Sequence, residues 1–245
     1  MQRYLIIFSY DGTLFFGYQR QPNKRTVQNE IEKVLSKICN SQITIHASGR
    51  TDKKAHALNQ HAHFDCEIKI NLEKFKRAIN TYLPKDIYIK KIKKVENNFH
   101  ARYSVKSKEY IYLLNTKEYN VFKRNYVFQY NKELDLIKMK EAIKDFKGKK
   151  DFASFSCKED LKANTIRTIY KASLKQEKEN LVFTFKASGF LKYQVRNMVG
   201  TLIEIGEGKK EPQEIKSIMN KKDRIFAGKT AHPEGLYLKN VKYWL

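Results

Sequence analysis

The sequence comprises 245 residues, of which 49 are Lys or Arg and 26 are Asp or Glu, so its formal net charge is +23. Hydrophobic residues make up 41% and aromatic residues 13%, a proportion of rings too high for a disordered basic tail, and a folded, strongly basic protein is expected. No run of apolar residues is long enough to span a bilayer, and the short apolar run at 4–8 lacks the features of a signal peptide.

The first half of the chain is predicted to alternate strands with two helices. Runs of β-branched and aromatic residues predict strands at 3–10, 43–45, 60–65 and 87–95. Apolar residues at helical spacing predict two helices in the same half, one capped by Thr26 and the other by Asn71. These helices cover 27–38 and 72–82, and Leu83-Pro84 closes the second.

The second half repeats this alternation. Strands are predicted at 108–114 and 236–243, with a hairpin formed by 166–174 and 181–186. Helices are predicted at 134–146, stopped by Gly148, and at 193–205, stopped by Gly206. The join lies near 102–108, so we expect an N-terminal domain over 1–105 and a C-terminal domain over 106–245. Each is an α+β half of ferredoxin-like or RNA-recognition type.

The excess of positive charge has three explanations at this point. A polyanionic nucleic acid is the first, because Lys and Arg that contact phosphates release condensed counterions. Docking to an anionic membrane is the second, although the lysines are scattered rather than gathered on one amphipathic segment. Codon bias of an AT-rich genome, which enriches Lys, is the third. Three widely spaced cysteines (Cys39, Cys66 and Cys157) predict no disulfide framework and indicate a reducing cytoplasm.

The most informative segment is the loop 48–57, which reads Ser-Gly-Arg-Thr-Asp-Lys-Lys-Ala-His-Ala. Asp52 stands there between Arg50 on one side and Lys53 and Lys54 on the other. Nearby positive charge lowers the pKa of a carboxyl group, so Asp52 would be ionised at neutral pH and able to act as a nucleophile or a base. The alternative is structural: Asp52 caps a turn and pairs with Arg50.

The order of motifs along nearly the whole chain resembles the TruA family of tRNA pseudouridine synthases. The N-terminal motifs are 10–13 (YDGT), 16–21 (FGYQRQ) and 49–52 (GRTD), followed by His56-Ala57. The later motifs are 83–87 (LPKDI), 99–102 (FHAR), 108–112 (KEYIY), 151–155 (DFASF), 165–167 (TIR), 189–191 (GFL), 195–200 (VRNMVG) and 230–236 (TAHPEGL).

This resemblance implies an isomerase that converts uridine to pseudouridine in tRNA without metal or cofactor. Asp52 takes the place of the family's catalytic aspartate, which could attack the sugar, attack the base or remove a ribose proton. Arg50 matches the arginine that replaces the flipped base, Tyr110 the tyrosine that stacks on the uracil, and Arg196 the arginine that pairs with the aspartate. The target would be a uridine extruded from the anticodon stem-loop, at about positions 38 to 40.

The resemblance also implies that the two halves share a central antiparallel sheet with the catalytic cleft between them, and that the cytoplasmic enzyme is a homodimer. The chain departs from the family at Lys53-Lys54-Ala55, where a small residue and Gly-Val are usual, and at His61, where Val is common. These departures leave open a paralogue that modifies ribosomal RNA. Two rivals are a non-catalytic RNA-binding protein and a zinc enzyme, the latter because four metal-binding side chains lie close in sequence: His56, His61, His63 and Cys66.

Overall fold

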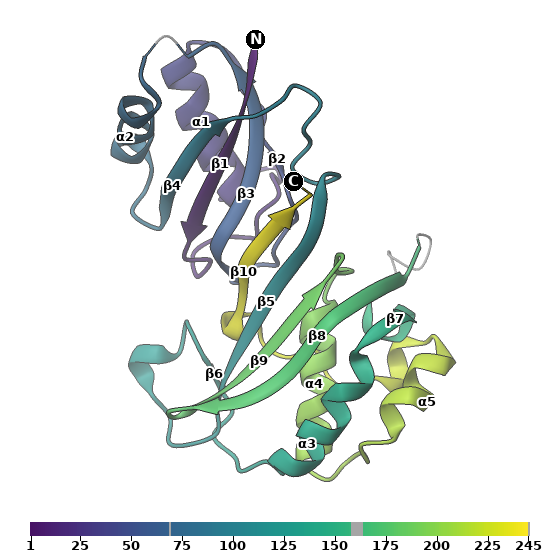
Figure 1. The fold of residues 1–245 in the computed structure, drawn as a ribbon. Helices are drawn as coiled ribbons and strands as arrows, with labels where there is room; N and C mark the ends of the chain where they lie inside the picture. Colours follow the sequence, from purple (N-terminus) through teal and green to yellow (C-terminus); the bar gives the residue numbers. More distant parts are fainter. Residues whose placement is uncertain (69, 158–163, 245) are drawn as a thin grey trace. The chain divides into compact units, whose positions relative to one another are not determined.

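A computed structural model describes residues 1–68, 70–157 and 164–244, which fall into two compact units (Figure 1). The first unit contains Met1–Lys106 together with Tyr237–Leu245, and the second contains Ser107–Leu236. Both units combine helices with a sheet, so the expected α+β class is confirmed. The last strand of the chain is part of the first unit, which a division by sequence order alone does not anticipate.

The sheet of the first unit has the strand order β4-β1-β3-β10, with a short strand β2 paired to β3. Helices α1 and α2 lie together beside this sheet (Figure 1). Strand β1 is antiparallel to both of its neighbours, whereas β10 runs parallel to β3, so this one pair departs from the expected antiparallel arrangement. The bounds are β1 (Gln2–Tyr10), α1 (Val27–Cys39), β2 (His46–Ala47), β3 (His56–Cys66), α2 (Leu72–Tyr82), β4 (Ile87–Lys94) and β10 (Leu236–Tyr243).

Local signals account for the two helices of this unit. The Thr26 side chain accepts from the amide of Asn29 and the Asn71 side chain accepts from that of Glu73, which confirms both predicted caps. The strand predicted at 43–45 is wrong, because backbone amides of this segment donate to side chains and not to a neighbouring strand. The Ile43 amide donates to the Ser36 hydroxyl at 2.9 Å, and the Ile45 amide to Glu32 Oε1 at 3.0 Å. The short strand β2 begins only after them.

The sheet of the second unit has the order β5-β9-β8-β7, with β6 parallel to β5, and helices α3, α4 and α5 gather beside it (Figure 1). The antiparallel pair β8–β9 confirms the predicted hairpin. The strands are β5 (Val105–Asn115), β6 (Phe128–Gln129), β7 (Gly148–Asp151), β8 (Ile166–Glu177) and β9 (Asn180–Ala187). The α-helices are α3 (Leu136–Ala142), α4 (Gln194–Gly206) and α5 (Glu214–Lys221), and 3₁₀ turns include η2 (Ile143–Phe146), η3 (Ala153–Phe155), η5 (Arg224–Phe226) and η6 (Pro233–Gly235).

Two predictions in the second unit need correction. Helix α3 begins after Asp135, which caps it, and its last turn is the 3₁₀ helix η2. Gly206 does not stop α4 but is its last residue. A Cβ there would lie 2.6 Å from Met139 Sδ, so glycine allows α4 to pack closely on α3. The short helix α5 was not predicted.

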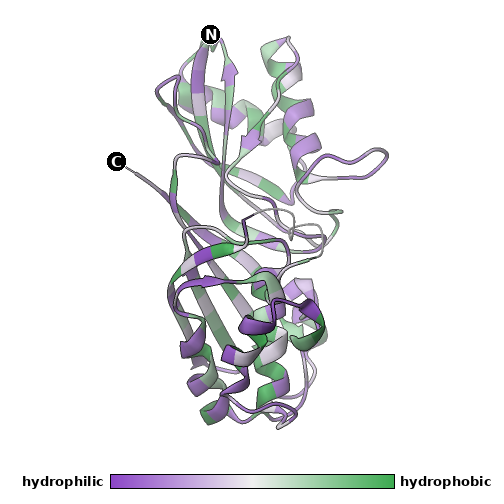
Figure 2. Cartoon of the chain, turned by 90° about the vertical axis from the view of Figure 1, so that its right-hand side faces the viewer, coloured by the Kyte–Doolittle hydropathy of each residue, from purple (hydrophilic) through white to green (hydrophobic). Residues whose placement is uncertain are grey.

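The core of each unit is built from buried apolar side chains, and the ribbon in Figure 2 shows hydrophobic and hydrophilic residues interspersed along the strands. Helix α4 is buried over most of its length and forms the centre of the second unit. Within the described residues, no helix combines the length and the apolar character needed to cross a membrane.

Candidate active site

The predicted catalytic loop connects β2 to β3 in the first unit, and burial changes sharply along it. Thr51 is buried, Asp52 is half-buried, and Lys53 and Lys54 are exposed. The Asp52 carbonyl accepts the Ala55 amide at 3.1 Å, which closes a four-residue turn. Asp52 is therefore the first residue of a tight turn that directly follows the buried Thr51.

The connection between β1 and α1 clamps this loop from one side. The Tyr10 hydroxyl is 2.7 Å from Thr51 Oγ1 in a buried hydrogen bond, and the Tyr18 amide donates to the Thr51 carbonyl at 3.2 Å. Burial raises the pKa of Tyr10, and the nearby charge of Asp52 also raises it, so the hydroxyl keeps its proton. One residue from each of the motifs at 10–13 and 16–21 thus holds Thr51, the residue directly before Asp52.

Glycine is required at position 12 because two backbones meet there. A Cβ on Gly12 would overlap the carbonyl oxygen of Ala55, the residue that closes the Asp52 turn. The Gly12 amide donates to His56 Nδ1 at 3.0 Å, and the same nitrogen lies 3.3 Å from Asp11 Oδ1. The His56 ring also stacks on Tyr237 of β10, with ring centres 4.6 Å apart. His56 is therefore part of the clamp.

Lys54 has a backbone φ of +66°, in the left-handed region. This is the position at which the resembled family usually carries glycine, and a lysine there costs about 1 kcal/mol or somewhat more. The Lys54 amide donates to the Phe15 carbonyl at 3.3 Å. The departure from the family therefore keeps the shape of the turn and places an exposed cation beside Asp52.

Arg50 is exposed and its guanidinium donates to the side-chain oxygen of Gln19, another residue of the clamp. The backbone beneath it is fixed by Gln60 of β3, whose amide nitrogen donates to the Gly49 carbonyl at 3.0 Å. The Gln60 side-chain oxygen accepts from the Ser48 hydroxyl at 2.7 Å. The loop thus presents Arg50 and Asp52 from one rigid support.

Tyr110 and Arg196 belong to the second unit. Tyr110 lies on β5 opposite Phe185, is 7% exposed, and its ring meets that of Phe190 edge to face at 5.2 Å. Tyr112, two residues along on the same face, donates its hydroxyl to the His232 carbonyl at 2.7 Å. The charge of Arg196 acts to lower the pKa of Tyr112, although burial, the larger cause, raises it. Tyr110 and Tyr112 therefore lie on one face of β5, and the charge of Arg196 reaches Tyr112.

Arg196 lies in the first turn of α4 and is held by the segment that precedes β10. Its Nε donates to the Ala231 carbonyl at 2.7 Å, and the Ala231 amide donates back to the Arg196 carbonyl at 3.1 Å. The guanidinium carbon lies 5.3 Å from the centre of the Tyr193 ring. Tyr193, just before α4, has a φ of +64°, a further sign of local constraint.

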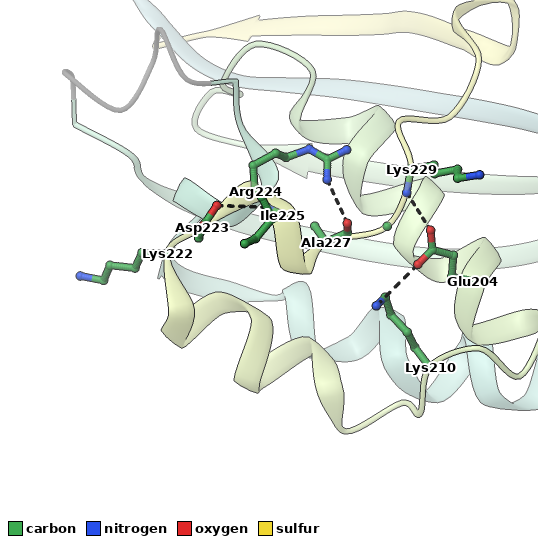
Figure 3. Close-up of a pocket in the computed structure, with 9 residues that line it drawn as sticks. Glu204, Lys210, Lys222, Asp223, Arg224, Ile225, Ala227 and Lys229 are labelled. Carbon is green, nitrogen blue, oxygen red and sulfur yellow. Dashed lines mark hydrogen bonds and ion pairs between the residues drawn. The ribbon is translucent and has the colours of Figure 1, made fainter.

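A hydrogen-bonded brace holds the segment 224–231 against α4. Asn197 Oδ1 accepts from the Thr230 hydroxyl at 2.7 Å and from Arg224 at 3.1 Å, and Arg224 also donates to Thr230 Oγ1 at 3.0 Å. Beside the brace lies a surface hollow of about 820 Å³ (Figure 3). Its polar groups are largely paired within the unit: Glu204 accepts the Lys229 amide at 2.8 Å and lies 3.6 Å from the Lys210 ammonium.

The histidines of β3 have structural partners. His63 Nδ1 accepts the Ala101 amide at 3.1 Å, and the buried His61 packs on Tyr243 with ring centres 5.4 Å apart. Cys66 donates to the Glu67 carbonyl at 3.6 Å, and burial raises the pKa of Cys39 to about 12. In the residues described, no three His, Cys, Asp or Glu side chains form a group that could hold a metal ion.

Sequence reasoning thus located Arg50 and Asp52 on one loop of the first unit and Tyr110 and Arg196 in the second. It missed the supporting residues, above all Tyr10, Gln60 and Asn197. Tyr10 and Asn197 lie inside the motifs that carry the family resemblance, so the motifs contained a signal for them. Gln60 could not be found in this way, because only the fold brings it under the loop.

Comparison with known proteins finds relatives that match this chain along most of its length. A family model described as tRNA pseudouridine synthase matches residues 6–104 and 142–244. The chain is similar to proteins named tRNA pseudouridine synthase A: that of Exiguobacterium sp. (strain AT1b) is 44% identical over 243 residues, 99% of this chain and 98% of the relative. That of Oceanobacillus iheyensis is 45% identical, with 99% and 97% covered, and that of Geobacillus sp. (strain WCH70) 46%, with 96% of each covered. The chain therefore belongs to the tRNA pseudouridine synthase family.

Proposed function

We propose that this protein isomerises uridine to pseudouridine in tRNA, with Asp52 as the catalytic carboxylate. The observation that carries the proposal is the Asp52 turn. It is clamped through Tyr10, Gly12 and His56, in a chain that matches the family along most of its length. A binding protein would have little use for a carboxylate on so firmly held a turn in a strongly basic chain.

The reaction exchanges one glycosidic bond for another within the same nucleotide. The bond from ribose C1′ to uracil N1 breaks, the base rotates, and a bond forms from C1′ to C5. The C5 proton leaves and N1 gains a proton, so the uracil is neither oxidised nor reduced. A carboxylate at Asp52 serves this sequence by attacking C1′, by attacking the base or by removing a ribose proton; each route needs Asp52 ionised.

Three further side chains have proposed roles. Arg50, exposed at the tip of the loop, takes the place of the extruded base in the RNA stem and so offsets part of the unstacking cost of a few kcal/mol. Tyr110 packs against the uracil through the part of its ring that Phe190 does not contact. Arg196, already oriented through the Ala231 carbonyl, pairs with Asp52 and keeps it ionised.

The proposed substrate is the anticodon stem-loop, with the reacting uridine extruded from about positions 38 to 40. We also propose that the protein works in the cytoplasm as a homodimer whose two copies share the RNA. A mass by analytical ultracentrifugation that stays at 29.0 kDa over the accessible concentration range would contradict the dimer.

The test of function compares the wild-type protein with Asp52→Asn on unmodified tRNA and ribosomal RNA. Pseudouridine-specific chemistry followed by sequencing reads every uridine. We expect modification of the anticodon stem-loop by the wild type and none by Asp52→Asn, with tRNA binding retained by both. Modification confined to ribosomal RNA would favour the paralogue. Binding without modification by the wild type would favour a non-catalytic RNA-binding protein.

A further inference from the structure

Two lysines converge on one exposed aromatic ring next to the Asp52 turn. The ring is that of Phe16, which is 38% exposed. The ammonium nitrogen of Lys53 lies 4.3 Å from the ring centre and that of Lys24 lies 4.8 Å from it. Phe16, Lys24 and Lys53 are here called the lysine–phenylalanine cluster.

The loop between Phe16 and Arg25 holds this cluster in shape. The Phe16 amide donates to the Arg25 carbonyl at 2.9 Å, and the Gln21 side chain donates to the Phe16 carbonyl at 2.8 Å. Between them, Pro22 and Asn23 form a turn closed by the Lys24 amide and the Gln21 carbonyl, with a φ of +55° at Asn23. The turn brings Lys24 back over Phe16.

The cluster is joined to Asp52 through the backbone. Lys53 directly follows Asp52, and the Lys54 amide donates to the carbonyl of Phe15 at 3.3 Å. The Gly17 backbone lies against the peptide units of residues 51–53. The backbones that carry the cluster and the Asp52 turn are therefore packed against each other.

These lysines differ from the arginines of the same loop in how their charges are paired. Arg20 pairs with Glu32 at 3.0 Å, and Arg25 makes a bidentate pair with Asp86 at 2.7 and 2.9 Å. Across the described ranges of the chain, no carboxylate pairs with Lys24 or Lys53 within 4.0 Å. Two like charges gathered at one ring are held there by cation–π attraction of about 0.5–1 kcal/mol each, and an anion would stabilise them further.

We propose that the lysine–phenylalanine cluster binds the phosphate backbone of the RNA strand next to the reacting nucleotide, an inference that rests on the function proposed above. Phosphate is favoured over a stacked base because the ammonium groups lie over the ring and reduce its open face. Such contacts position a strand without reading its sequence. Lys53, which stands where the family usually has a small residue, adds this contact to a surface that already carries Arg50.

The experiment measures tRNA binding as a function of salt. Lys24→Gln, Lys53→Gln and the double variant are made in the Asp52→Asn protein, so that no turnover occurs, and the probe is an unmodified tRNA transcript. Lys74→Gln is the matched control: Lys74 is exposed on α2, which follows the end of β3 that pairs with Gln2, whereas the Asp52 turn precedes the other end.

We expect the slope of log Kd against log salt concentration to fall by about 1 for each lysine removed and by about 2 for the double variant. The Lys74→Gln control should keep the slope of the parent Asp52→Asn protein. Lys53→Arg should also keep that slope, because arginine carries the same positive charge as lysine. In the Asp52-containing protein, the double variant should need a higher tRNA concentration than the wild type to reach its half-maximal single-turnover rate.

An unchanged salt slope in the double variant would overturn the inference, and so would a lost single-turnover rate with unchanged binding, because the cluster would then act on the shape of the turn. Failure of the proposed function looks different. In that case the wild type forms no pseudouridine at any tRNA concentration, whatever the salt slopes of the lysine variants.

Discussion

His61 gives a quantitative prediction because it is a buried, ionisable side chain at a position where the family commonly has Val. It is 6% exposed, and its Nδ1 is one of two buried side-chain atoms without a hydrogen-bond partner among the residues described, the other being the Tyr18 hydroxyl. Burial, with a smaller contribution from the charge of Lys93, lowers the pKa of His61 to about 4. The unfolded chain would titrate near the ordinary value of about 6.5.

The direction of the pH dependence follows from this difference. Because the pKa is lower in the folded state, the unfolded state binds the proton first as pH falls, and stability is lost between about pH 6.5 and pH 4. One pKa unit corresponds to about 1.4 kcal/mol, so His61 alone accounts for a loss of roughly 2 kcal/mol between pH 7 and pH 5. His61→Val removes this loss. At pH 7 its effect is smaller, because the gain from removing an unpartnered nitrogen is offset by the lost volume.

Urea unfolding of the wild type and His61→Val at pH 7 and pH 5, followed by circular dichroism, measures this difference. We expect the variant to lose about 2 kcal/mol less than the wild type over that interval. Lys93→Gln should reduce the loss by a smaller amount, because burial is the larger cause of the lowered pKa. Equal losses in the wild type and His61→Val would refute the assignment of a buried neutral imidazole.

Three further variants test the support of the proposed site. Lys54→Gly should raise the free energy of unfolding by about 1 kcal/mol, because glycine adopts a φ of +66° without strain; a lower Tm would contradict this. Gly12→Ala should lower kcat about 100-fold while the fold persists by circular dichroism, because its Cβ displaces Ala55 and with it the catalytic turn; wild-type kcat would show that the turn tolerates the displacement. Thr230→Val should cost about 1–3 kcal/mol in thermal unfolding, because the Asn197 side chain loses a buried partner; unchanged stability would argue against the brace.

Sequence reasoning placed helices well where the signal was local. Thr26 and Asn71 cap their helices by contacts two or three residues away, so the starts of α1 and α2 could be read directly. The strand at 43–45 failed because its amides bond to side chains of α1, which no local pattern reveals. Helix α5 was missed because eight residues with three buried positions make a weak periodic pattern.

The candidate site divides in the same way. Arg50 and Asp52 stand out because a short motif carries both. The contacts that hold them do not, because the hydrogen bond between Tyr10 and Thr51 joins residues 41 positions apart. Likewise, the left-handed backbone conformation of Lys54 could not be predicted from the sequence, because lysine rarely adopts that conformation.

Release of the C5 hydrogen tests the central claim most directly, because the C5 proton leaves only if a bond forms from C1′ to C5. Unmodified tRNA carrying tritium at C5 of uracil is mixed with excess wild-type protein or Asp52→Asn. The account predicts release approaching one tritium per target uridine with the wild type and none above background with Asp52→Asn. Equal release by both proteins would contradict the assignment of Asp52 as the catalytic carboxylate, and release by neither would contradict the proposed isomerisation.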